Sequence, residues 1–209
     1  MAGKPSILLF GGTFDPVHHG HLIVCLSVAE QLGVDRVVLI PAGQPPHKSG
    51  EPRSGAHHRL RMAQLGVEGE VLFDVSACEM ERTGPSYTLD TVRQFRSTYG
   101  PQASLYWLIG GDSLAELATW HEPRQLVDEC TIVTAVRRGH DLGDLRQLEK
   151  TLTSEQIARL KEYALDTPRI DVSATEIRRR VRAGRSIRYL VPRAVERYIL
   201  AQGLYLKSE

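Results

Sequence analysis

Two apolar runs that each end in a pair of glycines limit most strongly what this chain can fold into. They are SILLFGG, at residues 6–12, and LYWLIGG, at residues 105–111. Two further runs, Arg36–Ala42 and Cys130–Val136, are almost uninterrupted in the same way. Short apolar runs are typical of strands buried on both faces of a parallel sheet. Because helical patterns separate the runs, the sequence predicts an α/β fold: a doubly wound, Rossmann-like parallel sheet with helices on both faces.

The remaining elements are expected where turn residues bound a periodic pattern. The helix after the first run is expected at His21–Leu32, with Leu22, Leu26 and Ala29 on its buried face and Gly33 ending it. Further helices are expected at 58–65, 86–100, 112–120 and 145–163, and further strands at 71–75 and near Ile170. Two terminal helices form a small C-terminal helical segment at about residues 173–209. No repeat or linker divides the chain, so one domain is expected over residues 1–209.

Composition excludes several classes of protein. The net charge is +1 and the pI about 7.8, so no global field favours nucleic acid or membrane. The C-terminal arginines are scattered around two helices without exposed aromatics between them, which disfavours nucleic acid. Cys25, Cys78 and Cys130 lie far apart, and no run reaches the ~20 apolar residues that a membrane span needs. The N-terminal apolar run is too short for a signal peptide. We expect a cytoplasmic protein that acts on small molecules, as a monomer or a homo-oligomer.

Histidines gather where the first predicted strand ends, in GGTFDPVHHGHL at residues 11–22. Six of the eight histidines fall within the first 60 residues. Zinc binding is one interpretation, but no cysteine or carboxylate stands at ligand spacing from His18 and His21. Surface histidines at a helix start are a second interpretation. The third is phosphate binding, because free N–H groups at a helix N-terminus attract anions and imidazoles add donors there.

The motif His18-His19-Gly20-His21 resembles the first signature of the nucleotidylyltransferase superfamily. PAGQPPHK, GPSYTLDT, LIGGDSLAELATW and VSATEIR follow it in the chain and resemble, in the same order, motifs of bacterial nicotinate mononucleotide adenylyltransferases. The matches spread over residues 7–178. The resemblance implies transfer of the adenylyl group of ATP to nicotinate mononucleotide, with release of pyrophosphate, in NAD biosynthesis. It also implies Mg²⁺, held by the ATP phosphates and by no protein ligand.

The same resemblance implies a role for each site residue. The catalytic residues would be His18, His21, Lys48 and Arg178. Contacts to ATP would come from Gly11, Gly12, Thr13, Gly110, Asp112, Ser173 and Thr175. Contacts to nicotinate mononucleotide would come from His47, Tyr87, Thr88 and Trp120. No role is assigned to His19. Because the attacking phosphate is already ionised at neutral pH, the chemistry needs positioning and charge neutralisation rather than a general base.

Three features of these motifs bear on the expected roles. The family usually has serine where Ala174 stands, so one hydroxyl contact is missing. Asp112 could cap the following helix instead of binding ribose. Ser173-x-x-Glu176 is a capping box in its own right, with Arg178 leaving the helix on a face other than the core face.

Three rival functions share parts of the pattern. Pantetheine-phosphate adenylyltransferases share the first motif but lack anything like GPSYTLDT. Class I aminoacyl-tRNA synthetases have a lysine-rich second motif and need room for tRNA. A non-catalytic nucleotide-binding regulator would be expected to lose a catalytic contact. For the acid-or-amide choice, first-turn N–H groups near Tyr87 and Thr88 favour the carboxylate of nicotinate, with Asp90 pointing away.

Overall fold

The computed structural model describes residues 4–44, 54–137, 142 and 145–206. In these ranges six strands form one sheet in the order β3-β2-β1-β4-β5-β6, and every neighbouring pair is parallel. The strands are β1 (Ser6–Gly12), β2 (Arg36–Pro41), β3 (Phe73–Val75), β4 (Ser104–Gly110), β5 (Thr131–Arg137) and β6 (Ala164–Thr167). The chain builds outward from β1 to β3, then crosses back to place β4 on the other side of β1. The exits of β1 and β4 therefore form the topological switch point, where such sheets bind ligands.

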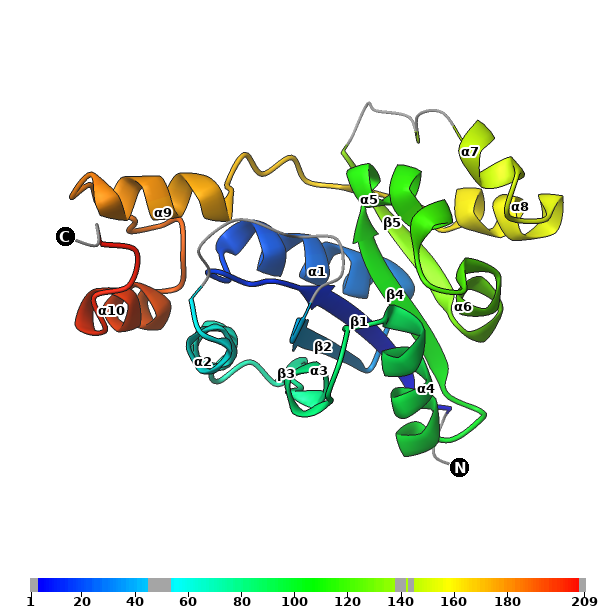
Figure 1. Cartoon of the computed structure of the whole chain (residues 1–209), viewed down its shortest axis with the longest axis horizontal. Helices are drawn as coiled ribbons and strands as arrows, with labels where there is room; N and C mark the ends of the chain where they lie inside the picture. Colours follow the sequence, from blue (N-terminus) through cyan, green and yellow to red (C-terminus); the bar gives the residue numbers. More distant parts are fainter. Residues whose placement is uncertain (1–3, 45–53, 138–141, 143–144, 207–209) are drawn as a thin grey trace.

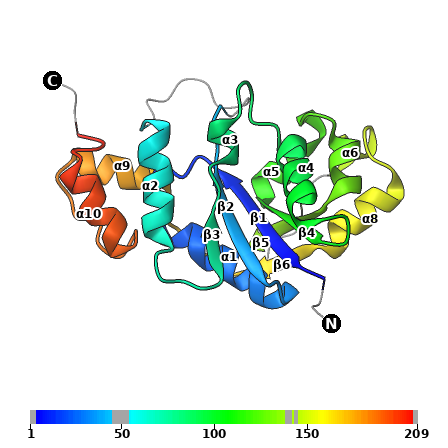
Figure 2. The same cartoon turned by 90° about the horizontal axis from the view of Figure 1, so that it is seen from below.

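Helices cover both faces of this sheet (Figure 1 and Figure 2). One face packs against α1 (His19–Leu32) and α2 (Ala56–Gly66), and the core on that side continues beyond the end of the sheet to α9 (Ala174–Arg182) and to α10 (Arg193–Ala201), which packs against α2. The other face packs against α3 (Cys78–Glu81), α4 (Thr88–Tyr99), α5 (Gly111–Glu116), the 3-10 turn η1 (Leu117–Thr119), α6 (Pro123–Glu129), α7 (Arg146–Glu149) and α8 (Ser154–Glu162). Successive strand residues alternate between the two cores: Leu8 and Leu39 face the first group, and Leu9 and Ile40 the second. The predicted doubly wound α/β fold is confirmed.

Three predicted elements have different bounds in the structure. The strand expected near Ile170 is β6, which lies earlier and ends just before Pro168, a residue with no N–H to donate to a sheet. The helix expected at 145–163 is two helices, because Thr153 caps a new helix through a reciprocal capping box with Gln156. The strand expected at 71–75 begins only at Phe73, and Val71 is fully exposed.

The buried face of the first crossover helix was predicted in part: Ala29 is buried and Leu22 packs against the core, but Leu26 does not. Cys25, Val28 and Ala29 are buried, whereas Leu26 is 41% exposed. The helix does end at Gly33, which has the predicted left-handed backbone with φ 63°. Two short helices, α3 and α6, were missed altogether, because four and seven residues are too few to show a period. The helix expected at 112–120 ends at Glu116 and continues as the 3-10 turn η1.

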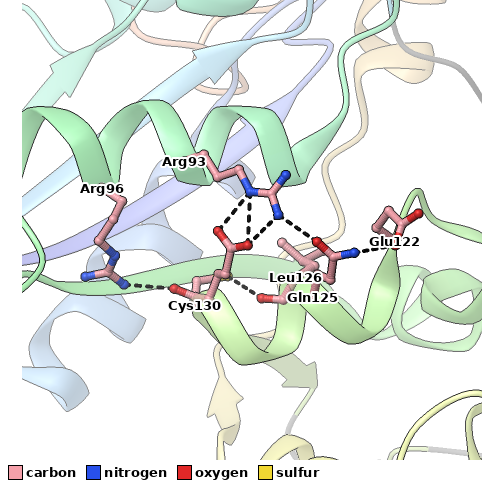
Figure 3. A network of polar contacts seen from close by, with 7 residues as sticks. Arg93, Arg96, Glu122, Gln125, Leu126 and Cys130 are labelled. Carbon is pink, nitrogen blue, oxygen red and sulfur yellow. Dashed lines mark hydrogen bonds and ion pairs between the residues drawn. The ribbon is translucent and has the colours of Figure 1, made fainter.

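A polar network fixes α4 against α6 (Figure 3). Arg93 of α4 donates to both carboxylate oxygens of Glu129 and, at 2.7 Å, to the side-chain oxygen of Gln125. Arg96 donates to the main-chain oxygen of Glu129 at 2.8 Å. The Arg93–Glu129 pair is partly exposed, so its contribution to stability is small, but it sets how the two helices lie.

Candidate active site

Two hollows meet at the switch point of the sheet. The larger, about 500 Å³, and the smaller, about 220 Å³, share Phe10, Leu108, Ile109 and Gly110 at the exits of β1 and β4. Of the residues predicted for the site, the larger hollow is lined by His18, His21, Gly110 and Asp112. The smaller is lined by Gly11, Gly12, Thr13, Tyr87, Thr88, Gly110 and Trp120. Predicted site residues from three separate motifs thus gather at one edge of the sheet.

The two signature histidines cap α1 reciprocally. His18 is the N-cap, and its Nδ1 accepts from the His21 N–H at 3.4 Å, while Nδ1 of His21 accepts from the His18 N–H at 3.3 Å. The rings stack with centroids 3.6 Å apart. Since both Nδ1 atoms accept, a neutral imidazole here carries its proton on Nε2, which becomes a donor. The sequence alone did not predict this capping role.

The electrostatics of His18 favour a neutral ring. His18 is only 6% exposed. Burial, and then the charge of His19, lowers the pKa of His18 from 6.5 to about 4. Gly20 fits between the histidines because a Cβ there would lie 3.0 Å from His18 Nδ1. His18 therefore offers an imidazole N–H donor without a fixed positive charge.

The exit of β1 is packed so that its backbone stays open to the smaller hollow. A Cβ on Gly11 would lie 2.6 Å from the Trp107 ring, and one on Gly12 would lie 3.0 Å from the Phe14 ring. Thr13 follows, and among the described residues nothing bonds its buried hydroxyl. A buried hydroxyl without a partner is destabilising. This one lines a hollow, so a ligand can supply the missing bond.

The second predicted phosphate-binding segment lies at the start of α9. Ser173 is its N-cap and accepts from the Glu176 N–H at 3.2 Å, but the Glu176 carboxylate pairs with Arg179, so only half of the predicted capping box forms. Ser173 and Thr175 are exposed and lie outside both hollows.

Arg178 does not leave α9 for the surface. It is 7% exposed and donates to the main-chain oxygen of Asp15 at 2.9 Å and to Thr175 Oγ1 at 3.3 Å. Since Asp15 lies in the loop between β1 and α1, the arginine ties α9 to the loop that carries His18. His47 and Lys48, the other predicted basic pair, lie outside the described residues.

Sequence reasoning missed two buried charged residues beside this loop. Arg59, on α2, is 4% exposed and donates to the main-chain oxygens of Thr13, Ala42 and Ser54 at 3.1, 2.6 and 3.3 Å. The Asp15 carboxylate accepts from the Ser54 N–H at 3.1 Å and from the Tyr205 hydroxyl at 2.6 Å. Together they join the exits of β1 and β2 to the C-terminal segment. The sequence does carry a signal for the burial of Arg59. This arginine stands three residues before Met62 and four before Ala63, which places it on the apolar side of the helix HHRLRMA.

The smaller hollow contains the aromatic residues. Trp120 is half-buried, as predicted, and the neighbouring His121 stacks on the Tyr87 ring at 4.1 Å. Tyr87 is the N-cap of α4, but its own N–H donates to the Pro85 oxygen at 3.1 Å. That part of the prediction was wrong: the Tyr87 N–H is already engaged, and the free first-turn N–H groups begin at Thr88.

Two predictions about carboxylates have opposite outcomes. Asp112 lies in the first turn of α5, whose N-cap is Gly110, so the alternative in which Asp112 caps the helix is wrong. It is exposed and lines the larger hollow. Asp90 was expected to point away from the substrate. It lines neither hollow, and its charge acts on Arg93, one turn along α4.

Fold and site together define a nucleotide-binding α/β protein, because glycine-rich strand exits and a helix N-terminus meet at the switch point of a parallel sheet. The family model described as Cytidylyltransferase-like matches residues 9–180. A Thermomicrobium roseum protein named "Probable nicotinate-nucleotide adenylyltransferase" is 44% identical over 96% of this chain and 92% of its own length. A Moorella thermoacetica protein of the same name is 39% identical over 94% and 90%. The chain belongs to the Cytidylyltransferase-like family and, within it, to the nicotinate-nucleotide adenylyltransferases.

Solved structures share the fold. Plasmodium falciparum nicotinic acid mononucleotide adenylyltransferase complexed with NaAD aligns with a TM-score of 0.71 at 18% identity, over 96% of this chain and 97% of that one. The same enzyme complexed with APC gives 0.72. Within the described ranges, no helix is long and apolar enough to cross a membrane. In the same ranges no three His, Cys, Asp or Glu side chains are grouped as a metal site.

Proposed function

We propose that the two adjoining hollows hold the two substrates of one reaction, ATP and nicotinate mononucleotide. The chain is a nicotinate-nucleotide adenylyltransferase of NAD biosynthesis. A phosphate oxygen of the mononucleotide attacks the α-phosphorus of ATP, and the bond from that phosphorus to the β-phosphate oxygen breaks. The products are nicotinate adenine dinucleotide and pyrophosphate. The observation that carries the assignment of sites is the stacked histidine pair, which stands beside the strand exits that both hollows share.

His18 and His21 are proposed to donate from Nε2 to the transferring phosphoryl group. Neutral donors suit this role because they stabilise charge that develops in the transition state without binding the substrate anions equally tightly. Gly11, Gly12 and the buried Thr13 hydroxyl line the adjoining path. Asp112 and Gly110, at the exit of β4, are proposed to contact the ribose of ATP from the larger hollow.

The distal phosphates of ATP are assigned to the basic side of the site. Arg178, Ser173, Thr175 and the N-terminus of α9 are proposed to hold them, together with Lys48. Since Arg178 already donates to the Asp15 oxygen, it both joins α9 to the histidine loop and adds positive charge there. Ala174 supplies no hydroxyl, so the N–H groups of α9 make a larger share of the contacts to the distal phosphates.

The smaller hollow is proposed to take nicotinate mononucleotide. Trp120 stacks on the pyridine ring, His47 meets the phosphate, and Tyr87 borders the ring. The first-turn N–H groups of α4, beginning at Thr88, face the carboxylate. This arrangement favours the acid over the amide, because the NH₂ of an amide would meet donors where acceptors are needed.

Mg²⁺ is proposed to enter with ATP as a chelate of its phosphates. The buried Asp15 carboxylate is the nearest candidate ligand on the histidine loop, but it already accepts two hydrogen bonds. The donor set of imidazoles and arginine suits phosphate oxygens rather than a cation. The metal would therefore be held by the substrate, where it neutralises phosphate charge.

The test is a panel of substrates offered to the full chain. ATP with nicotinate mononucleotide should release pyrophosphate and yield a product with the mass of nicotinate adenine dinucleotide. CTP in place of ATP, or phosphopantetheine in place of the mononucleotide, should give only background. Turnover of phosphopantetheine at a comparable rate would overturn the substrate assignment and leave only the nucleotidyl transfer.

A further inference from the structure

A buried carboxylate that the proposed reaction does not use lies in the wall of the smaller hollow. Glu79, on the short helix α3, lines the hollow yet is only 5% exposed. Its Oε1 accepts from Thr91 Oγ1 at 2.8 Å. Thr91 is fully buried, and its hydroxyl in turn accepts from Arg82 Nη2 at 3.0 Å. The carboxylate thus ends a chain of hydrogen bonds that runs into the first turns of α4.

Ser86 gives Glu79 a second hydroxyl donor. Ser86 Oγ accepts from the N–H groups of Gly43 and Gln44 at 3.1 and 3.0 Å, which uses both of its lone pairs. Its one proton therefore points elsewhere, and the Glu79 carboxylate is the acceptor on that side: a hydrogen bond from Ser86 opposes the rise that burial causes in the pKa of Glu79. The direction of every bond in the group follows: both hydroxyls donate and Glu79 accepts.

The backbone around Glu79 is closely packed. A Cβ on Gly43 would lie 2.1 Å from the main-chain oxygen of Glu79, so α3 sits directly against the segment that leaves β2. The Ser86 N–H also donates to the Gln44 oxygen at 2.9 Å. Three segments meet around Glu79: the β2 exit at its main-chain oxygen, α3 itself, and the start of α4 at its carboxylate.

The two hydroxyls that Glu79 accepts from stand on either side of Thr88, the first residue of α4. We propose that Glu79 is a positioning residue that fixes the first turn of α4, so that its N–H groups are aimed at the carboxylate of the mononucleotide. This rests on the proposed function of the smaller hollow. Glu79 does not touch the substrate; it determines specificity through Ser86 and Thr91.

Repulsion by the Glu79 charge and positioning by Glu79 predict opposite effects on binding of the acid, so an experiment can tell them apart. A carboxylate in the wall of an anion site would by itself weaken binding of the acid. The positioning role predicts the reverse: losing Glu79 as an acceptor harms the acid more than the amide. Glutamine keeps the shape of Glu79 but offers one acceptor and one NH₂, and that NH₂ would meet a Ser86 oxygen whose lone pairs are filled.

The experiment compares Glu79→Gln with Glu81→Gln, an exposed glutamate on the same helix, in the full chain. Steady-state kinetics are measured with ATP, nicotinate mononucleotide and nicotinamide mononucleotide. Glu79→Gln should raise KM for nicotinate mononucleotide about tenfold or more, as for one lost charge-assisted hydrogen bond, with KM for ATP unchanged. The acid-to-amide ratio of kcat/KM should fall with it. Glu81→Gln should match the wild type.

A second variant guards against a failure to fold. Thr91→Val keeps the shape of Thr91 and removes one donor, and it should shift the same two quantities in the same direction. A lower KM for the acid in Glu79→Gln would show that the carboxylate only repels. Unchanged kinetics in Thr91→Val, or in a folded Glu79→Gln, would show a purely structural role, and either result overturns the proposal. If the wild type itself does not turn over nicotinate mononucleotide, the proposed function fails instead.

Discussion

Replacing His18 by asparagine tests the environment of the histidine pair through stability alone. Asparagine retains a side-chain acceptor at the N-cap of α1 but does not titrate. In the folded chain, burial lowers the pKa of His18 from 6.5 to about 4. Between these two values the unfolded chain binds the proton more readily than the folded one. The contribution of neutral His18 to the free energy of unfolding is therefore fully present above about pH 6.5 and is lost as the pH falls toward 4.

The magnitude follows from the same two values. The full contribution is about 3 kcal/mol, since a tenfold change in proton affinity corresponds to ~1.4 kcal/mol. At about pH 5, roughly 2 kcal/mol of it is already lost. His18 is 6% exposed, so solvent screening removes little of this energy.

The assay is urea unfolding of the ligand-free wild type and of His18→Asn, each at about pH 7.5 and about pH 5. Acidification should destabilise the wild type by ~2 kcal/mol more than the variant. Comparing the two chains cancels other groups, including His58, whose pKa is lowered by burial in the same direction. Equal pH dependence in both chains would refute the claim that the folded site keeps His18 neutral.

Three further predictions concern activity. His21→Ala should reduce kcat by on the order of 10²–10³ while circular dichroism stays that of the wild type, because a transition-state donor is lost; near-normal kcat would remove His21 from the reaction. Arg178→Ala should weaken ATP binding, measured by calorimetry, more than mononucleotide binding, with the exposed Arg179→Ala as its control; equal ATP affinity would place Arg178 outside the site. The wild type should prefer nicotinate over nicotinamide mononucleotide, in kcat/KM, by a factor of up to about 10⁴; equal values would mean that the smaller hollow is misassigned.

The fold was predictable because its central strands are buried on both faces. Runs such as Ile7–Phe10 and Arg36–Ala42 have no polar interruption, so length and turn residues decide the assignment. The edge strand β6 lacks that signal, since Ala164–Thr167 is half polar, and the prediction slipped past Pro168 to Ile170. Leu26 was assigned to the core from helical spacing alone, although α1 turns Cys25 and Val28 inward.

The site was predictable where a motif lies within a few residues of one strand exit. GGTFDPVHHGHL placed His18 and His21 correctly at the switch point, although the reciprocal cap between them depends on geometry that spacing does not encode. Arg59 and Glu79 were missed because their partners are far along the chain: Arg59 bonds Thr13, 46 residues away, and Glu79 bonds Thr91, 12 residues away. The hydrogen-bond partners of such buried charged residues can be identified only once the fold has brought donors and acceptors together.

In adenylyl transfer at this site, the mononucleotide phosphate attacks the α-phosphorus of ATP. This attack is tested most directly by following isotopes through one turnover with nicotinate mononucleotide. Label in the α-phosphate of ATP should appear wholly in the dinucleotide, and label in the γ-phosphate wholly in pyrophosphate. Label from the γ-phosphate in the mononucleotide product, or no labelled dinucleotide, would contradict adenylyl transfer.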